Sequence, residues 1–281
     1  MIERVLIATD LTGGSAFAIG RGCRIAAKQE AELRIVHVLP PGVPDDERAT
    51  TRRKVFDQLE GRVGAPQGAE LDAAITIAEG YAPSAIVREA REFCADLIVM
   101  GAHGEPYIED AIFGTTATHV MRRSSCPVLL AQEEDRCPYE TVMVAIGGDE
   151  DERLLETAFR IAPANDVYVV HAYATPVADL LGYGDVAEDL RTEHEVQSLR
   201  VRRSLAAVGK APSAARLHSI VDEGDVMEVI GRAWRNSEPD LLVMGTHARG
   251  GLSRLFFGSY AESVLLGYHS DILVMRTGGV E

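Results

Sequence analysis

The sequence predicts an α/β protein made of two tandem domains, each a doubly wound sheet flanked by helices. The first observation is an internal repeat. The segment that begins at Glu79 and the segment that begins at Glu223 align without a gap, 144 residues apart (223 − 79 = 144). A repeat of this length is one duplicated domain rather than a short solenoid unit. The second observation is that strand and helix patterns alternate in each half, which is typical of a mostly parallel sheet with right-handed crossovers.

The strands of the first half are short and continuously apolar, which suits strands that helices cover on both faces. We expect strands at Arg4–Thr9, Ala31–Val38, Ala69–Ile77, Asp96–Met100 and Pro127–Ala131. Between them, apolar residues recur at helical spacing. This spacing predicts helices at Ser15–Gln29, Glu47–Arg62, Ala82–Cys94 and Thr115–Arg123.

The second half repeats the same order of elements. Its expected strands are Thr141–Ile146, Asp166–Ala174, Ala215–Asp222, Leu241–Met244 and Ile272–Met275, and its expected helices are Glu150–Ile161, Val186–Val208, Asp225–Arg235 and Ser259–Leu266. The segment Gln132–Tyr139 is charged and contains Pro138, so it interrupts the periodicity. We therefore expect a first domain at residues 1–132 and a second at residues 139–281.

Each half ends in an apolar strand that would leave an exposed edge if it had no neighbour. We expect these two last strands, Pro127–Ala131 and Ile272–Met275, to pair with each other.

Composition and charge exclude several classes of function. The net charge is −15 and both halves are acidic, whereas a nucleic-acid-binding face is normally basic. No run of 18 apolar residues indicates a membrane span, and the N-terminus does not resemble a secretion signal. The four cysteines show neither zinc spacing nor a disulfide framework. We expect a protein of the cytoplasm that binds neither nucleic acid nor membrane and has no metal centre of its own.

A glycine loop follows the same apolar strand in both halves. In the first half, Gly101 and Gly104 follow the strand Asp96–Met100, and Gly114 then precedes Thr115 and Thr116 at the start of a helix. In the second half, Gly245 is followed at the same distance by Gly258 and Ser259. A helix N-terminus with unpaired N–H groups suits a phosphate, and glycine allows the backbone to approach it closely.

The spacing Gly-x2-Gly-x9-Gly-Ser/Thr after a strand that ends in Met-Gly resembles the nucleotide loop of the universal stress protein family. The opening VLIATD, His37-Val38 at the end of the second strand and SSCPVLL in the last strand support the resemblance, which covers nearly the whole chain once per half. It implies a five-stranded parallel sheet in the order 3-2-1-4-5 in each domain. It also implies that ATP binds with an Asp near the nucleoside and the glycine loop on the phosphates. The residues it assigns to nucleotide binding are Asp10, Val38, Gly101, Gly104, Gly114, Thr115, Thr116, Gly245, Arg249, Gly258 and Ser259.

Each half departs from that pattern in its own way. The first loop carries Glu105, Glu109 and Asp110, and each carboxylate about 8 Å from a phosphate costs on the order of 2 kcal/mol at an effective dielectric near 20. The second loop has Arg249, which suits a phosphate, but Ala248 replaces its second glycine and Gly147 replaces the Asp. These deficits are comparable, so both sites remain candidates, and Mg²⁺ would offset the acidic residues of the first loop.

The expected function is binding of an adenine nucleotide, ATP or ADP, by a tandem universal stress protein that regulates a stress response. No catalytic residue is predicted. His103 and His247 are the only bases shared by both loops, so a slow ATPase is one alternative. A scaffold that binds no nucleotide and acts through a regulatory protein partner is another, and a homodimer is compatible with each reading. His37 and His171 end matching strands and are expected to be packing or loop-anchoring residues.

Overall fold

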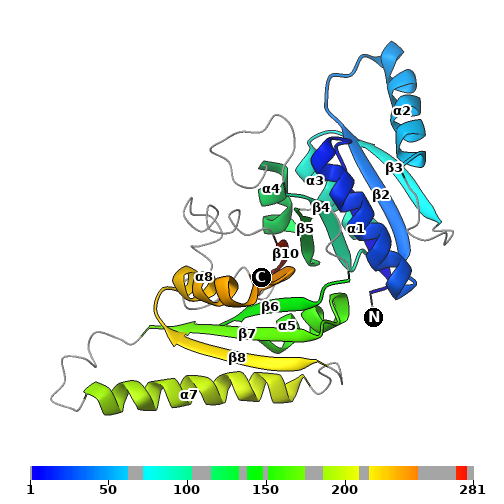
Figure 1. The fold of residues 1–281 in the computed structure, drawn as a ribbon. Helices are drawn as coiled ribbons and strands as arrows, with labels where there is room; N and C mark the ends of the chain where they lie inside the picture. Colours follow the sequence, from blue (N-terminus) through cyan, green and yellow to red (C-terminus); the bar gives the residue numbers. More distant parts are fainter. Residues whose placement is uncertain are drawn as a thin grey trace. The chain divides into compact units, whose positions relative to one another are not determined.

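The computed structural model describes residues 2–62, 72–102, 115–132, 138–147, 151–174, 186–208, 215–245 and 270–276 (Figure 1). Contacts divide the chain into two compact units. Unit 1 holds Met1–Cys137 together with His269–Arg276, and unit 2 holds Pro138–Tyr268 together with Thr277–Glu281. The end of the chain therefore contributes a strand to the unit that the beginning of the chain forms.

Unit 1 is a sheet with alternating helices. Its elements are β1 (Arg4–Ala8), α1 (Gly13–Gln29), β2 (Glu32–Leu39), α2 (Asp45–Glu60), β3 (Ala73–Glu79), α3 (Ala82–Glu92), β4 (Leu97–Gly101), α4 (Thr115–Arg123), β5 (Val128–Ala131) and β10 (Asp271–Met275). The strand order is β3-β2-β1-β4-β5-β10, and β1 to β5 pair in parallel. The expected order 3-2-1-4-5 is confirmed for this unit.

Unit 2 repeats the arrangement. Its elements are β6 (Thr141–Ile146), α5 (Asp151–Ile161), β7 (Asp166–Tyr173), α7 (Val186–Ala207), β8 (Arg216–Glu223), α8 (Val226–Ser237) and β9 (Leu241–Gly245). The strand order is β9-β6-β7-β8, and all the pairs are parallel. If the strands are numbered within the second half and read from β8 to β9, this is the order 3-2-1-4. The predicted helix Ser259–Leu266 lies outside the described residues.

The two last strands pair, as expected. β10 runs antiparallel to β5, with Ile272 opposite Leu130 and Val274 opposite Val128. Every residue of both strands is buried. This pairing covers the apolar edge of β5. It adds one antiparallel strand, β10, to the five parallel strands of the first sheet.

The third strand differs most from its predicted bounds. It was expected at Ala69–Ile77; residues 69–71 lie outside the described residues, and β3 runs from Ala73 to Glu79. The polar end remains in the strand because its backbone pairs with β2, where Leu39 lies opposite Glu79. Backbone pairing does not depend on side-chain polarity, so the apolar pattern missed these residues.

Helix α1 packs closely on the first sheet because Gly22 carries no side chain. A Cβ at Gly22 would lie 2.5 Å from Cδ1 and Cγ1 of Ile7 on β1. Ile7 is fully buried, so it has little room to move. This close approach holds the middle of α1 against β1. None of the helices in the described ranges combines the length and apolarity of a membrane span.

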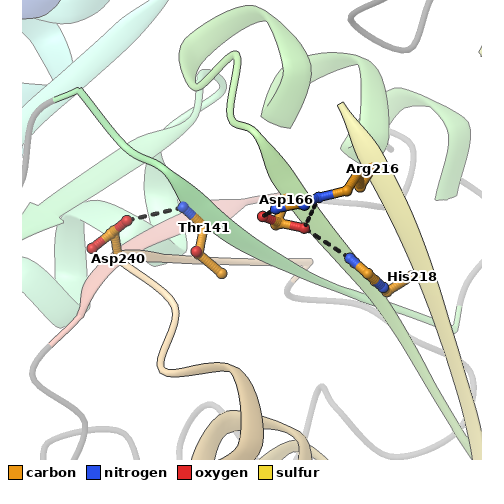
Figure 2. Close-up of polar contacts among 5 residues, drawn as sticks. All are labelled: Thr141, Asp166, Arg216, His218 and Asp240. Atoms are coloured by element: carbon orange, nitrogen blue, oxygen red, sulfur yellow. Dashed lines mark hydrogen bonds and ion pairs between the residues drawn. The ribbon is translucent and has the colours of Figure 1, made fainter. Parts of the chain in front are cut away.

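A matched pair of aspartates joins strands at the amino ends of both sheets. Asp96, before β4, accepts hydrogen bonds at Oδ2 from the backbone N–H groups of Glu3 (2.8 Å) and Arg4 (3.0 Å). Asp240, before β9, accepts at Oδ2 from the N–H groups of Glu140 and Thr141, both at 2.9 Å. Figure 2 shows the bond to Thr141. The repeated aspartate thus has a structural role at the end of the sheet opposite the glycine loops.

A second polar cluster lies at the amino ends of β7 and β8 (Figure 2). Asp166 accepts two hydrogen bonds from the guanidinium of Arg216 and lies 2.8 Å from Nε2 of His218. The ring of His218 stacks on Tyr168 with centroids 4.4 Å apart. These hydrogen bonds, led by that of Arg216, lower the pKa of Asp166 to about 2. The cluster joins the edge strand β8 to its neighbour.

Candidate functional site

The order of the strands in unit 1 places a switch point between β1 and β4. From β1 the chain continues to β2 and β3 on one side, and β4 and β5 lie on the other. Ligands of doubly wound sheets bind outside the carboxyl ends of the strands at such a point. Because Ala8 lies opposite Met100, the residues after β1 and the residues after β4 leave the sheet side by side. Asp10 and Gly101 therefore belong to neighbouring strand ends.

Asp10 is held in a fixed orientation by Thr12. Its Oδ1 accepts hydrogen bonds from the backbone N–H (3.0 Å) and from the hydroxyl (2.6 Å) of Thr12. The side chain is exposed, and its Oδ2 makes no hydrogen bond with any residue in the described part of the chain. One carboxylate oxygen thus positions the group, while the other can accept hydrogen bonds from a ligand.

The residue after Asp10 has a strained backbone. Leu11 has φ of 67°, in the left-handed region that residues with a Cβ seldom occupy. Its N–H donates to Oγ1 of Thr9 (3.1 Å), and its carbonyl accepts from Nη1 of Arg62 (2.9 Å). Such conformations cost on the order of 1–3 kcal/mol and gather at ligand sites. The surrounding contacts hold the loop in this conformation.

A histidine on the second strand anchors the same loop. His37 Nδ1 lies 2.9 Å from the carbonyl oxygen of Thr9, and His171 Nδ1 lies 3.2 Å from the carbonyl oxygen of Ile146 in unit 2. A carbonyl can only accept, so Nδ1 carries the proton in both rings. The predicted loop-anchoring role of His37 and His171 is confirmed.

Of the first glycine loop, the structure describes only the residues at its two ends. Gly101 is the last residue of β4, half-buried and opposite Ala131. Thr115 and Thr116 begin α4, and Nδ1 of His119 lies 2.6 Å from the carbonyl oxygen of Thr115. Gly104 and Gly114 lie outside the described residues, as do His103, Glu105, Glu109 and Asp110.

An aromatic contact joins Tyr81 to helix α4. Tyr81 follows β3 and is 57% exposed. Its ring lies edge-on to His119 on α4, with centroids 6.2 Å apart. Val38, half-buried on β2, lies opposite Ala78 at the same edge. The structure thus brings Asp10, Val38 and Gly101 to the ends of three adjacent strands.

Sequence reasoning missed Thr12, Arg62 and Tyr81. An aspartate in a loop often accepts a hydrogen bond from the backbone N–H two residues later, so the turn from Asp10 to Thr12 could have been found in the sequence. Arg62 and Tyr81 come from other elements, and no local pattern indicates where their side chains lie.

Unit 2 arranges the corresponding residues differently. Gly147 follows β6 in the place of Asp10 and donates its N–H to Oδ1 of Asp151 (2.9 Å). Asp151 is buried, and its Oδ2 lies 3.9 Å from Nη2 of Arg200 on α7. Gly245 ends β9 and is buried. Arg249, Gly258 and Ser259 lie outside the described residues.

The second strand of unit 2 also meets helix α7. Nε2 of His171 lies 2.9 Å from Oε1 of Gln197, whose amide donates to Glu193 (2.7 Å). Burial and the nearby carboxylates of Glu223, Glu193 and Asp222 raise the pKa of Tyr173 at the end of β7. By contrast, Nε2 of His37 has no partner among the described residues. Polar side chains of the protein itself therefore occupy the carboxyl edge of unit 2 to a greater extent than that of unit 1.

No group of three or more His, Cys, Asp or Glu side chains in the described ranges could hold a metal ion. Cys23, Cys94 and Cys126 are free thiols, and burial raises the pKa of Cys23 to about 11. A buried thiol with a raised pKa is not a nucleophile.

The strand order and the switch point define a class of α/β proteins with doubly wound sheets, in which ligands meet the carboxyl ends of the strands. The family model described as "Universal stress protein family" matches residues 1–132 and 138–276. The chain belongs to the universal stress protein family, with two domains in tandem.

Individual relatives agree with this assignment over the full chain. A universal stress protein of Mycobacterium tuberculosis is 22% identical, over 97% of this chain and 96% of its own length. Universal stress protein E of Salmonella typhi is 24% identical, over 98% and 95%. The crystal structure of a universal stress protein from Archaeoglobus fulgidus has a TM-score of 0.66 at 19% identity and covers 99% of this chain and 97% of its own. The predicted family and fold class are confirmed.

Proposed function

We propose that this protein binds an adenine nucleotide, ATP or ADP, at the carboxyl edge of unit 1. The observation that supports this most directly is the orientation of Asp10 at the switch point. Its Oδ1 is engaged by Thr12, and its Oδ2 is left toward solvent beside the end of β4. A carboxylate held in this way suits the hydroxyl groups of a ribose. Thr115 and Thr116, with the first N–H groups of α4, suit the phosphates.

The two units are proposed to differ in affinity. Unit 2 has Gly147 where unit 1 has Asp10, and the N–H of Gly147 is already bonded to Asp151. Losing a hydrogen bond to a charged group costs about 1.5–3 kcal/mol, which corresponds to roughly 10- to 100-fold in affinity. Mg²⁺ is proposed to accompany the nucleotide at the first site, where Glu105, Glu109 and Asp110 would otherwise repel the phosphates.

Titration calorimetry with ATP and ADP, with and without Mg²⁺, tests the proposal. Gly114→Asp should abolish binding at the first site, whereas Gly258→Asp should leave it. Asp10→Asn should weaken binding by about 10- to 100-fold. Asp72→Asn, the same charge change at an exposed position at the opposite end of the first sheet, is the matched control. The absence of both heat and a melting shift with every adenine nucleotide would reject the proposal in favour of a protein-binding scaffold.

We further propose that the output is regulation of a stress response in the cytoplasm rather than turnover. In-line attack on a phosphate needs a positioned base and cations, and the carboxylate of Asp10 is bonded to Thr12 rather than to a candidate nucleophile. Steady-state phosphate release should stay below roughly one per second. A faster rate that His103→Ala or His247→Ala abolishes would assign an ATPase instead.

A further inference from the structure

Helices α5 and α7 of unit 2 border an open groove that is not part of the proposed nucleotide site. Its volume is about 660 Å³, and it is lined by Asp151 and Glu152 of α5 and by Val196, Leu199, Arg200 and Arg203 of α7. Val196 and Leu199 are each 52% exposed. Large apolar side chains that are half exposed side by side on one helix indicate a surface that another helix can cover.

The inner face of α7 already has its partner. Val201 is fully buried and Ser204 nearly so, and α7 contacts both β7 and β8. Figure 1 shows α7 as a long helix beside β8. The exposed stripe of Val196, Leu199 and Arg203 is spaced by three and then four residues, which is the a and d spacing of a helix–helix seam.

Along α7, acidic residues lie before this apolar centre and basic residues lie after it. Glu193 and Glu195 precede Val196, whereas Arg200, Arg202 and Arg203 follow Leu199. Glu195 and Arg202 are both exposed and form no ion pair with any residue that the structure describes. A helix with this order of charges is complementary to an identical helix that runs in the opposite direction.

We propose that the stripe on α7 binds α7 of a second copy of this chain, antiparallel, in the α5–α7 groove. A two-fold axis midway between Val196 and Leu199 brings the apolar pairs of both copies together. In the heptad that this seam defines, Glu195 and Arg202 both occupy g positions. Antiparallel helices pair g with g, so Glu195 of each copy lies beside Arg202 of the other. Such an interface is isologous and closes as a dimer.

The second wall of the groove favours the same occupant. Glu152 of α5 is exposed and has no ion-pair partner in the described ranges, so it can accept an arginine of the second copy. The chain as a whole carries a net charge of −15, whereas Arg200, Arg202 and Arg203 form one of its few basic clusters. A seam of two apolar residues per copy is small, so we expect a weak dimer that depends on concentration.

Sedimentation of the full chain between about 5 and about 500 µM measures the dimer, a range that brackets weak association. Glu195→Arg and Arg202→Glu should each be monomeric, because like charges then meet twice across the two-fold axis. An equimolar mixture of the two variants should dimerise again, since both cross-pairs become attractive. Leu199→Ser should raise the dissociation constant at least about tenfold.

Glu228→Arg on α8 is the matched charge control. It makes the same substitution at an exposed site on another helix of unit 2 and should leave the dimer unchanged. Circular dichroism confirms that each variant is folded. A chain that stays monomeric over the whole range would overturn the proposal. So would a dimer that survives Glu195→Arg, or variants that fail to associate when they are mixed.

Discussion

Arg21 and Asp271 form a buried ion pair that joins the first helix to the last strand. Nε of Arg21 on α1 lies 2.6 Å from Oδ2 of Asp271 at the start of β10, and the two side chains are 1% and 0% exposed. The other carboxylate oxygen, Oδ1, accepts the backbone N–H of Gln132 at 3.0 Å. A single aspartate therefore contacts both the helix that covers the sheet and the chain just beyond β5.

Removing one member of this pair should be costly. A buried charge that loses its partner typically destabilises a protein by about 3–5 kcal/mol. We expect Asp271→Ala to lower the free energy of unfolding by this amount in urea denaturation. Arg21→Met combined with Asp271→Ala should recover part of it, because no buried charge then remains. A loss below about 1 kcal/mol in the single variant would show that the pair does not stabilise the fold.

The repeated aspartates Asp96 and Asp240 should contribute equally to stability. Each accepts two backbone N–H groups at the start of a strand. Replacing either with alanine leaves two donors without an acceptor, which costs about 1–3 kcal/mol. We expect Asp96→Ala and Asp240→Ala to shift the urea midpoint to a similar extent. If only one variant shifts it, the two halves do not share this stabilising contact despite their matched geometry.

Asp166 should make the stability of the protein depend on pH in the acid range. Its folded pKa is lowered to about 2, first by the hydrogen bond from Arg216 and then by that from His218. The stabilisation is therefore present above the unfolded pKa of about 3.9 and lost as the pH falls toward 2. We expect Asp166→Asn to be less stable than the wild type at pH 5. The difference in unfolding midpoint should shrink between pH 4 and pH 2. A difference that stays constant down to pH 2 would argue against the ion pair.

Thr12 should matter for ligand binding more than for folding. Its hydroxyl donates to Oδ1 of Asp10 at 2.6 Å in an exposed loop. Thr12→Val removes this bond and allows the Asp10 carboxylate to turn. We expect adenine nucleotide affinity to fall several-fold in calorimetry, while the unfolding free energy changes by less than about 1 kcal/mol. Thr12→Ser retains the hydroxyl and should retain affinity. Equal affinity in Thr12→Val would mean that the orientation of Asp10 is set elsewhere.

Much of the fold could be predicted because its information is local and repeated. Continuously apolar runs between helical patterns predicted β1, β4 and β6 to within one residue of their ends. The roles of His37 and His171 followed from their matched positions. In contrast, Arg21 lies in an ordinary helical sequence, and its partner is 250 residues away (271 − 21 = 250). No periodicity indicates that an arginine faces inward when the group that neutralises it comes from another part of the chain.

The positions of the candidate residues at the strand ends could be predicted, but their supporting contacts could not. Asp10, Val38 and Gly101 were assigned from the resemblance to the universal stress protein family, and they lie where ligands of doubly wound sheets meet the strand ends. The bond from Gly147 to Asp151 could not be predicted, since it depends on the exact path of a short turn. The same holds for Arg62, which reaches the loop from the end of α2. Such contacts depend on tertiary packing, which a single sequence does not display.

The pairing of β5 with β10 has a consequence for synthesis of the chain on the ribosome. β5 is complete at Ala131, but its neighbour begins only at Asp271, 140 residues later (271 − 131 = 140). At about 5–20 residues per second, roughly 7–28 seconds pass before that neighbour can leave the ribosome. During this time the apolar edge of β5 is open to any other unpaired strand in the cell. The nascent chain is therefore most exposed to misassembly after its first half has already been made.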